Sequence, residues 1–326
     1  MIYVDIDTKG TMRLPFYLAM EEYVARNIYK GEDCFFMWQV NPTVIFGRNQ
    51  LIENEVNLDY CRTHGIQTYR RKSGGGCVYA DMSNIMFSYV TKNEQVCYTF
   101  NRYISMIALM LRKLGVDAQT TGRNDILIDG RKVSGNAFYH IPGRSIVHGT
   151  MLYDTCMENM VGSITPGDAK LLSKGVKSVR QHIALLKDYT SLSIDEFKRF
   201  VRENLCDGEI CLTHSDVAAV ERIMQEYLTN EFIYGNNPRY TLVRKRRFEG
   251  VGDFEVRLQL KNNVIRDLDL KGDYFLVGDL DRDLLCHLHG VTLDAPSLRA
   301  VLSTLSLSSV IHNMDAEMFL RLLLDE

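Results

Sequence analysis

The sequence has little of what marks a membrane-spanning, secreted or nucleic-acid-binding protein. Its 38 basic and 41 acidic residues leave a formal net charge of −3, so a bulk electrostatic attraction to nucleic acid or anionic lipid is not expected. The first residues, Met1 to Asp7, lack the basic and long apolar regions of a secretory signal. The best apolar run, Ile104 to Leu111, is far shorter than the ~20 residues that cross a bilayer. We therefore expect a cytoplasmic protein that binds neither membrane nor nucleic acid.

Paired cysteines and two common catalytic motifs are also missing. The eight cysteines are scattered along the chain without any CxxC spacing, and the nearest pair is Cys206 and Cys211. This argues against a disulfide framework and against a structural zinc site. The GxSxG motif of serine hydrolases and the HExxH motif of metalloproteases do not occur. Reduced, mostly buried thiols are the simplest interpretation of the cysteines.

The composition and the hydrophobic pattern predict a folded α+β protein. With 46% hydrophobic and 24% charged residues, the composition is that of an ordinary globular chain. A length of 326 residues suggests about two domains. Short strand-like runs and helical runs mix without a regular βαβ rhythm. We therefore expect an α+β fold with a large mixed or antiparallel sheet in a catalytic domain, followed by a small α+β accessory domain.

Periodicity and turn residues predict the individual elements. Strands are expected at 2–7, 34–39, 43–47, 66–70, 77–81, 85–91, 125–128, 132–139 and 145–153, and helices at 14–29 and 100–114. Helical pattern dominates from about 166 to 228, with a capping box at Ser193 and Glu196.

The last part of the chain has the pattern of a second domain. Asn236-Asn237-Pro238 indicates a loop, and a hairpin is expected around Asn262-Asn263. Amphipathic segments follow at about 281–288, 296–305 and 315–325. We place the two domains at residues 1–240 and 241–326.

The most informative segment is the run from Arg70 to Tyr79, Arg-Arg-Lys-Ser-Gly-Gly-Gly-Cys-Val-Tyr. Gly74–Gly76 have no side chains to keep a ligand from the backbone, and their N–H groups can converge on an anion. Arg71 adds a planar guanidinium that suits phosphate. A strand follows, so the segment is neither a P-loop nor a Rossmann turn, both of which open a helix. The alternative interpretation is a flexible surface turn.

A second segment combines a hairpin turn with a lysine. Gly122-Arg123-Asn124-Asp125 precedes Asp129-Gly130, a strong hairpin signal. Lys132 lies just past that turn, where its ammonium could point into a cleft. The small residues Ser134, Gly135 and Ala137 leave room for a ligand close to the backbone. The alternative is a solvated lysine in an exposed hairpin.

Three other segments are less specific. His148-Gly149-Thr150 contains a histidine that is more often structural than catalytic, and Gly47-Arg48-Asn49-Gln50 could be a strand that ends in a glycine turn. The basic run Arg244–Arg247 favours a solvated surface over a nucleic-acid patch, given the net charge.

Taken together and in this order, these segments resemble the motifs of the lipoate–protein ligase A family, in the biotin/lipoate ligase superfamily. The matches are Gly47 to Gln50, Arg70 to Val78, Gly122 to Asp125, Arg131 to Ala137, His148 to Thr150 and Lys174 to Arg180. The family element His-Asp-x-Gly-Asn is matched in part, by Ala80 to Asn84. The resemblance covers about residues 1–190 strongly, and the tail resembles the family's small C-terminal domain.

The resemblance implies a two-step reaction with ATP and lipoate as substrates and Mg²⁺ as the metal ion. The lipoate carboxylate attacks the α-phosphate of ATP, which gives lipoyl-AMP and pyrophosphate. A lysine amine of an apo lipoyl domain then displaces AMP. The implied acceptors are the lipoyl domains of 2-oxoacid dehydrogenase complexes and the glycine-cleavage H protein, and the implied enzyme is a monomer.

The resemblance also gives roles to residues. Lys132 is the expected catalytic residue, a protonated clamp on the acyl carbonyl oxygen and the α-phosphate. The residues expected to hold ATP and lipoyl-AMP are Arg71, Gly74, Gly75, Gly76, Cys77, Val78, Tyr79, Asn84, Asn124, Asp125 and Lys132. Asp125 is also the candidate Mg²⁺ ligand. Trp38, Phe46 and Val78 are the candidate walls of an apolar lipoyl tunnel, and Lys174–Arg180 is expected to close over the adenylate.

Ala80 and Ser83 depart from the family pattern, which has His and Gly at these positions. The absent imidazole puts ordinary reaction rates or the substrate range in question. The alternative is a lipoyl or octanoyl transferase, which does not carry out the activation step. Cys77 and Cys156 are its candidate nucleophiles, against their interpretation as small apolar side chains. A biotin ligase would need a Gly-Arg-Gly-Arg-x-Gly loop, which is missing. A non-catalytic carrier-binding or nucleotide-sensing module is supported by Ala80 alone, and the choice between lipoate and octanoate stays open.

Overall fold

The computed structural model describes residues 1–7, 10–50, 52–92, 96–121, 124–164, 182–234, 242–261 and 263–325. The chain divides into two compact units. Unit 1 comprises Met1–Phe46, Glu53–Arg71 and Cys77–Ile233, and unit 2 comprises Gly47–Ile52, Lys72–Gly76 and Tyr234–Glu326. Two short segments from early in the chain therefore group with the C-terminal part. A boundary between residues 240 and 241 stays our proposal for where the two folding domains meet.

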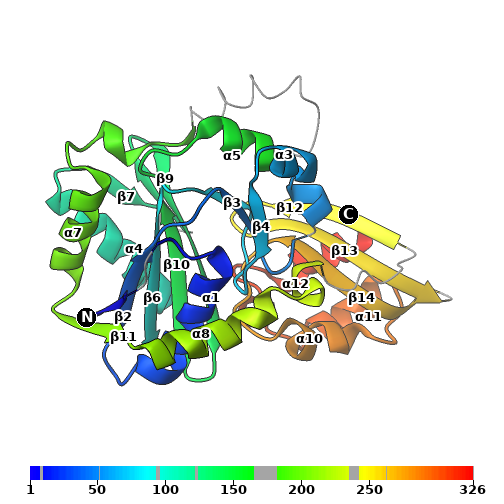
Figure 1. Cartoon of the computed structure of the whole chain (residues 1–326). Helices are drawn as coiled ribbons and strands as arrows, with labels where there is room; N and C mark the ends of the chain where they lie inside the picture. The colour runs from blue at the N-terminus through cyan, green and yellow to red at the C-terminus, as the bar shows by residue number, and fades with distance from the viewer. Residues whose placement is uncertain are drawn as a thin grey trace. The chain divides into compact units, whose positions relative to one another are not determined.

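An eight-stranded sheet forms the centre of unit 1 (Figure 1). Its strands lie in the order β11-β1-β2-β6-β10-β9-β8-β7. Their bounds are β1 Ile2–Ile6, β2 Cys34–Trp38, β6 Ile85–Lys92, β7 Ala118–Thr120, β8 Asp125–Ile128, β9 Arg131–Ile141, β10 Arg144–Met151 and β11 Gly208–Leu212. Strand β1 pairs in parallel with β11 and β2, and the other neighbours are antiparallel. The mixed sheet of an α+β protein is confirmed.

The helices of the first 234 residues begin in part at side-chain caps: Asn57, Ser193 and Thr213 each cap one, and the helix at Leu14 begins without one. Their bounds are α1 Leu14–Tyr23, α2 Ile52–Glu55, α3 Leu58–Thr63, α4 Val96–Lys113, α5 Met157–Ile164, α7 Ile194–Leu205, α8 His214–Tyr227 and α9 Asn230–Tyr234. Ser193 and Glu196 form the predicted capping box of α7, and Thr213 and Asp216 form another at α8. Helix α1 continues into a π-helical turn, Val24–Ile28. Among the described residues, no helix is long and apolar enough to cross a membrane.

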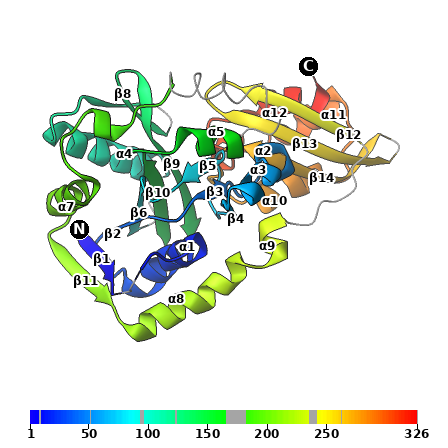
Figure 2. The same ribbon diagram turned by 45° about the horizontal axis from the view of Figure 1, so that its top comes forward.

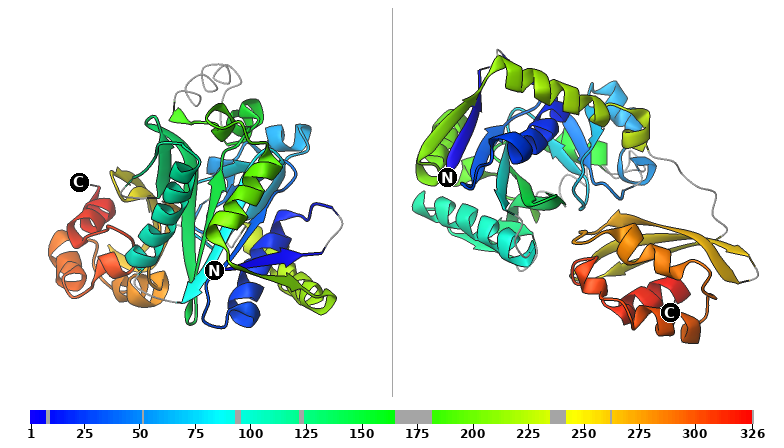
Figure 3. Two further views of the ribbon diagram at one scale, coloured as in Figure 1. Left: turned by 90° about the vertical axis from the view of Figure 1, so that its left-hand side faces the viewer. Right: turned by 90° about the horizontal axis from the view of Figure 1, so that it is seen from below.

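Helices cover both faces of the eight-stranded sheet because its central strands are apolar on both sides. In β6, Met86 and Val90 join the core that contains α1, whereas the ring of Tyr89 lies 5.6 Å from that of Tyr103 in α4. Alternate residues of one strand therefore face opposite helical layers. Figure 3 shows α1 and α4 on opposite sides of the sheet, and Figure 2 shows α8 running along α1.

A smaller three-stranded sheet in unit 1 has the order β4-β3-β5. Its strands are β3 Thr43–Phe46, β4 Gln67–Arg70 and β5 Val78–Ala80. Strand β3 pairs in parallel with β4 and antiparallel with β5. The strands predicted at 34–39 and 43–47 both exist, but they belong to different sheets. The chain leaves this small sheet at Arg71 and returns at Cys77, on either side of the three glycines.

Three strands were not predicted from the sequence, and one of them is the short strand β7 at the edge of the large sheet. Strand β11 lies within the region expected to be helical, and it pairs with β1 at the edge of the large sheet. Three of its five side chains, Glu209–Cys211, are exposed, so the strand shows no apolar alternation. Strand β12, Leu242–Phe248, contains the basic run. Its Lys245 and Arg247 are exposed, as a solvated run should be.

Unit 2 contains the predicted hairpin and helices. Strands β12, β13 (Gly252–Lys261) and β14 (Val264–Asp273) form an antiparallel sheet. The helices are α10 Leu280–Asp283, α11 Ala295–Leu302 and α12 Ala316–Leu324. Val256 and Leu258 of the sheet share a buried core with Leu298 and Phe319 of the helices. The expected loop at Asn236-Asn237-Pro238 lies outside the described residues.

Candidate active site

The β8–β9 hairpin forms as the Asp-Gly sequence predicts. Its turn residues Asp129 and Gly130 have φ values of 50° and 72°. Positive φ at both central residues is the geometry of the tight turn that Asp-Gly favours between antiparallel strands. The turn brings Lys132 back beside the end of β8.

A β-bulge at Val133 determines which face of the hairpin carries Lys132. Ser134 and Lys132, on either side of Val133, pair with consecutive residues of β8. A regular register would put Lys132 opposite Ile128, which is buried. The extra residue moves Lys132 to the other face, which Asp125 shares. The bulge therefore turns the ammonium from the core to a partly exposed surface.

Lys132 and Asp125 form an ion pair there. The Nζ atom of Lys132 lies 2.8 Å from Oδ1 of Asp125, and the two side chains are 40% and 28% exposed. The N–H of Ala184 donates to the Lys132 carbonyl at 2.8 Å. A Cβ atom on Gly135 would lie 2.8 Å from this Nζ, so the small residue is needed. Both side chains of the pair are partly exposed and can therefore be reached by a ligand.

Asn124 belongs to the same cluster. It precedes Asp125, and its Nδ2 donates to the carbonyl of Asn136 at 3.2 Å. Asn124, Asp125 and Lys132 are therefore neighbours in unit 1. Gly122 and Arg123, the first half of the Gly-Arg-Asn-Asp motif, lie outside the described residues, as does Lys174–Arg180.

The turn from Asp81 to Asn84 is tied to the residues that follow β10. The N–H of Cys156 donates to Asp81 Oδ2 at 3.2 Å. Asn84 Nδ2 donates to Thr155 Oγ1 at 2.8 Å, and Asn84 is 1% exposed. Ala80, which stands where the family has histidine, is fully buried. The turn makes these hydrogen bonds without that imidazole.

The three glycines lie in unit 2, beside the end of β14. The N–H of Gly75 donates to the Tyr274 carbonyl at 3.1 Å, and Gly75 has a φ of 87°. A Cβ atom on Gly74 would lie 2.2 Å from the Tyr274 carbonyl oxygen. The glycines therefore permit a close backbone approach, here to the protein's own chain.

Lys72 and Ser73 group with the three glycines in unit 2, whereas Arg71 and Cys77–Tyr79 lie in unit 1. Arg71 donates from its backbone N–H to Phe46 O and from Nη1 to Ile45 O, both at 3.0 Å. Cys77 and Val78 are partly exposed. Tyr79 is buried, burial raises the pKa of its hydroxyl, and Asn159 Nδ2 donates to that hydroxyl at 3.3 Å.

A buried polar chain in unit 1 contains a carboxylate that sequence reasoning missed. Glu21 on α1 is 0% exposed and pairs with His148 of β10. Ser88 Oγ donates to Glu21 Oε1 at 2.6 Å, and Trp38 Nε1 donates to Ser88 Oγ at 2.8 Å. The chain of hydrogen bonds therefore runs from His148 to Trp38.

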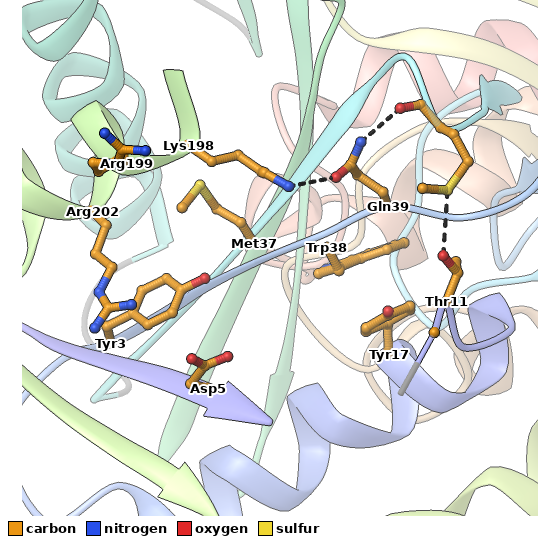
Figure 4. A pocket seen from close by; sticks show the side chains of 12 residues that line it. Tyr3, Asp5, Thr11, Tyr17, Met37, Trp38, Gln39, Lys198, Arg199 and Arg202 are labelled. Carbon is orange, nitrogen blue, oxygen red and sulfur yellow. Dashed lines mark hydrogen bonds between the residues drawn. The ribbon is translucent and has the colours of Figure 1, made fainter. Parts of the chain in front are cut away.

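Trp38 also lines a cavity of about 430 Å³ in unit 1 (Figure 4). Its ring stacks on Tyr17 with centroids 4.9 Å apart. Across the cavity, Lys198 Nζ donates to Gln39 Oε1 at 2.9 Å, and Gln39 Nε2 donates to the Met82 carbonyl at 2.6 Å (Figure 4). The cavity thus adjoins the turn that carries Asn84. The other two residues expected to line a lipoyl tunnel, Phe46 and Val78, are not among those that line this cavity. Phe46 is fully buried, and Val78 packs at the edge of the core.

Comparison with known proteins defines the class of this fold. Residues 14–206 match the lipoyl protein ligase A/B catalytic domain, and residues 237–323 match the bacterial lipoate protein ligase C-terminus. The chain thus has the two domains of a lipoyl protein ligase. A relative named lipoate–protein ligase 1, from Staphylococcus aureus, is 34% identical over 94% of this chain and 95% of its own length. The chain belongs to the lipoate–protein ligase family, which confirms the resemblance of the motifs.

Solved structures agree with this assignment. A bipartite lipoate protein ligase from Thermoplasma acidophilum, described with its E2 lipoyl domain, superimposes with a TM-score of 0.65 at 28% identity. The match covers 74% of this chain and 98% of that chain. A lipoate–protein ligase A bound with ATP gives a TM-score of 0.61 at 25% identity, over 72% and 98% of the two chains.

Proposed function

We propose that this chain is an ATP-dependent lipoate–protein ligase, which joins the carboxyl group of lipoate to a lysine amine of apo lipoyl domains. The observation that carries the proposal is Lys132, which the β-bulge turns toward Asp125. It is the lysine of the motif Arg-Lys-Val-Ser-Gly-x-Ala. A relative with this name matches nearly the whole chain, and one similar structure holds ATP.

The chemistry needs a fixed positive charge. In the first step a lipoate carboxylate oxygen attacks the α-phosphorus of ATP, and pyrophosphate leaves. In the second step the acceptor amine attacks the acyl carbon, and AMP leaves. Both steps build negative charge on oxygens close to one point, where a preorganised cation lowers the barrier. Lys132 would donate to the acyl oxygen and the α-phosphate, with Asp125 fixing its orientation.

The other site residues keep their proposed roles. Arg71 and the segment Gly74–Tyr79 would hold the nucleotide and the lipoyl group, because exposed N–H groups and a guanidinium suit phosphate. Asn84, Asn124 and Asp125 would line the phosphate side. Trp38 is the best-supported wall for the lipoyl chain, since it combines burial with a place beside a cavity.

Asp125 is the residue that would contact Mg²⁺. Within the described part of the chain, no group of three or more His, Cys, Asp or Glu side chains could hold a metal ion. A single carboxylate fits an ion that takes most of its ligands from phosphates and water, as Mg²⁺ commonly does. Such an ion would neutralise phosphate charge beside Lys132.

For acceptors we propose apo lipoyl domains of 2-oxoacid dehydrogenase complexes and the glycine-cleavage H protein, modified in the cytoplasm by a monomeric enzyme. Only the E2 lipoyl domain as an acceptor has support from a similar protein, the T. acidophilum ligase that is described together with its E2 lipoyl domain.

The test follows both steps separately. In the first arm the chain is incubated with ATP, Mg²⁺, lipoate and an apo lipoyl domain. In the second arm it is incubated with lipoyl-AMP and the same acceptor. The mass of the acceptor is then measured by mass spectrometry. We expect lipoylation in both arms. In Lys132→Ala, lipoate-dependent ATP–pyrophosphate exchange should fall by about 100-fold or more, whereas Lys113→Ala, on the exposed face of α4, should leave it unchanged. Product from lipoyl-AMP alone would indicate a transferase, and undiminished exchange in Lys132→Ala would remove Lys132 from the mechanism.

A further inference from the structure

Asn136 follows Gly135 on β9 and is 4% exposed. Its backbone N–H and its side-chain Nδ2 both donate to the carbonyl oxygen of Asn124, at 3.1 Å and 3.0 Å. Its own carbonyl accepts from Asn124 Nδ2 at 3.2 Å. Three hydrogen bonds therefore fix the residue that directly precedes Asp125.

The neighbouring strand leaves space for this amide. In the pairing of β9 with β10, Asn136 lies opposite Gly149. A Cβ atom on Gly149 would lie 1.8 Å from Asn136 Oδ1, closer than any contact allows. The amide also donates to Ser134 Oγ at 3.1 Å. Gly149, the middle residue of His-Gly-Thr, is thus the residue that admits the Asn136 side chain.

Thr121 also holds the backbone of Asp125, through hydrogen bonds. The Asp125 N–H donates to Thr121 Oγ1 at 3.1 Å, and the Asp125 carbonyl accepts from the Thr121 N–H at 3.0 Å. Thr121 and the Asn124–Asn136 bonds therefore leave the Asp125 backbone little freedom. This backbone carries the carboxylate that lies 2.8 Å from Lys132 Nζ.

We propose that Asn136 is a positioning residue for ligation: its amide holds the Asn124 carbonyl and thereby sets the contact between Asp125 and Lys132. The inference rests on the proposed function of Lys132. It extends that function to a residue that the motif Arg-Lys-Val-Ser-Gly-x-Ala leaves unspecified. Asn136 acts through Asn124 and Asp125.

A small displacement of the ammonium is enough to matter. Electrostatic stabilisation works only when the donor is in place before charge develops, and an error of about 1 Å can cost about 100-fold in rate. Removal of the Asn136 side-chain amide leaves two hydrogen bonds in place, those that the backbone N–H and the carbonyl of Asn136 make with Asn124. The hairpin should therefore keep its fold while the Lys132 contact loosens.

The experiment compares Asn136→Ala with the nearly isosteric Asn136→Asp, which keeps the side-chain shape next to Gly149 but cannot donate to the Asn124 carbonyl. The matched controls are Asn101→Ala and Asn101→Asp, at an exposed position of α4. For each full-length variant, kcat and KM of lipoate-dependent ATP–pyrophosphate exchange are measured together with the melting temperature. Asn136→Ala is also combined with Lys132→Ala, with enough enzyme to follow the residual rate.

We expect both Asn136 variants to lower kcat at least about tenfold with KM for lipoate within about twofold, and both Asn101 variants to match the parent. In the Lys132→Ala background, Asn136→Ala should cost less than twofold, because the group it positions is gone. An unchanged kcat overturns the proposal, and so does an equal loss in both backgrounds. If Asn136→Ala does not fold, the kcat of Asn136→Asp decides whether the proposal holds. A parent chain without lipoate-dependent exchange would instead refute the proposed function.

Discussion

The imidazole Nδ1 of His148 lies 2.9 Å and 3.0 Å from the two carboxylate oxygens of Glu21, inside unit 1. Both side chains are almost fully buried, at 7% and 0% exposure. A buried carboxylate is tolerated only where donors replace the lost water. His148, together with Ser88, supplies them. The histidine of the His-Gly-Thr motif is therefore part of the polar chain that ends at Trp38.

Removal of Glu21 should destabilise the fold strongly. Glu21→Ala removes the acceptor that Ser88 and His148 contact in the core, and each buried polar group left unsatisfied typically costs about 1–3 kcal/mol. Glu21→Gln keeps an acceptor oxygen and should cost less. The free energy of unfolding is measured by urea denaturation. Glu221→Ala, on the exposed side of α8, is the control, with an expected change within about 0.5 kcal/mol. A Glu21→Ala protein as stable as the parent would contradict the buried-pair interpretation.

A methyl group at residue 135 should test the position of Lys132 without removing its charge. In Gly135→Ala the new Cβ would lie 2.7 Å from Lys132 Cε and 2.8 Å from Nζ. The flexible end of the lysine can move away, so the fold should survive. The ammonium would then leave its place beside Asp125, and ATP–pyrophosphate exchange should fall by about tenfold to 100-fold. Circular dichroism and the melting temperature check the fold. Exchange at the parent rate would mean that Lys132 works from more than one position.

The sequence predicted the β8–β9 hairpin but not the direction of Lys132. Asp129-Gly130 sets the turn locally, so the hairpin could be found from two residues. The bulge at Val133 has no comparable local signature, because a valine between Lys132 and Ser134 fits a regular strand equally well. Which face receives Lys132 is decided by how the core packs against Ile126 and Ile128.

Glu21 shows a second limit of sequence reasoning. It lies in a helix whose first nine residues are all buried, so no polar face marks it as special. Its partner His148 is 127 residues away, and only the folded sheet brings them together. The glycine-rich loop is the opposite case: its composition made it stand out, although its contact with Tyr274 could not be predicted.

Glu255 should make the stability of unit 2 depend on pH. Burial works to raise the pKa of Glu255, but hydrogen bonds from Lys245 and Arg257 outweigh it and hold this pKa below its ordinary value. A carboxyl group with a depressed pKa in the folded state adds stability above its unfolded pKa, about 4.3 for Glu. That stability is lost as the pH falls through the lower, folded value. The difference in unfolding free energy between the parent and Glu255→Gln should therefore be full at pH 7 and shrink below about pH 4. Urea denaturation at pH 7, 5, 4 and 3 measures it, and a difference that does not change with pH would refute the assignment.

Substitution of Cys156 distinguishes a ligase from a transferase that uses a cysteine nucleophile. It is exposed at the start of α5, and its backbone N–H, rather than its thiol, contacts Asp81. If Lys132 activates the acyl group directly, the thiol takes no part, and Cys156→Ser should transfer the lipoyl group from lipoyl-AMP at a rate within about twofold of the parent. The same holds for Cys77→Ser, and Cys286→Ser, exposed in unit 2, is the control. Acceptor mass gives the rate, and intact-protein mass under acid quench reveals any thioester on the enzyme. A thioester in the parent, together with a loss of transfer in Cys156→Ser or Cys77→Ser, would place a covalent acyl-enzyme on the pathway. Transfer would then depend on a sulfur nucleophile, and Lys132 would no longer account for the second step.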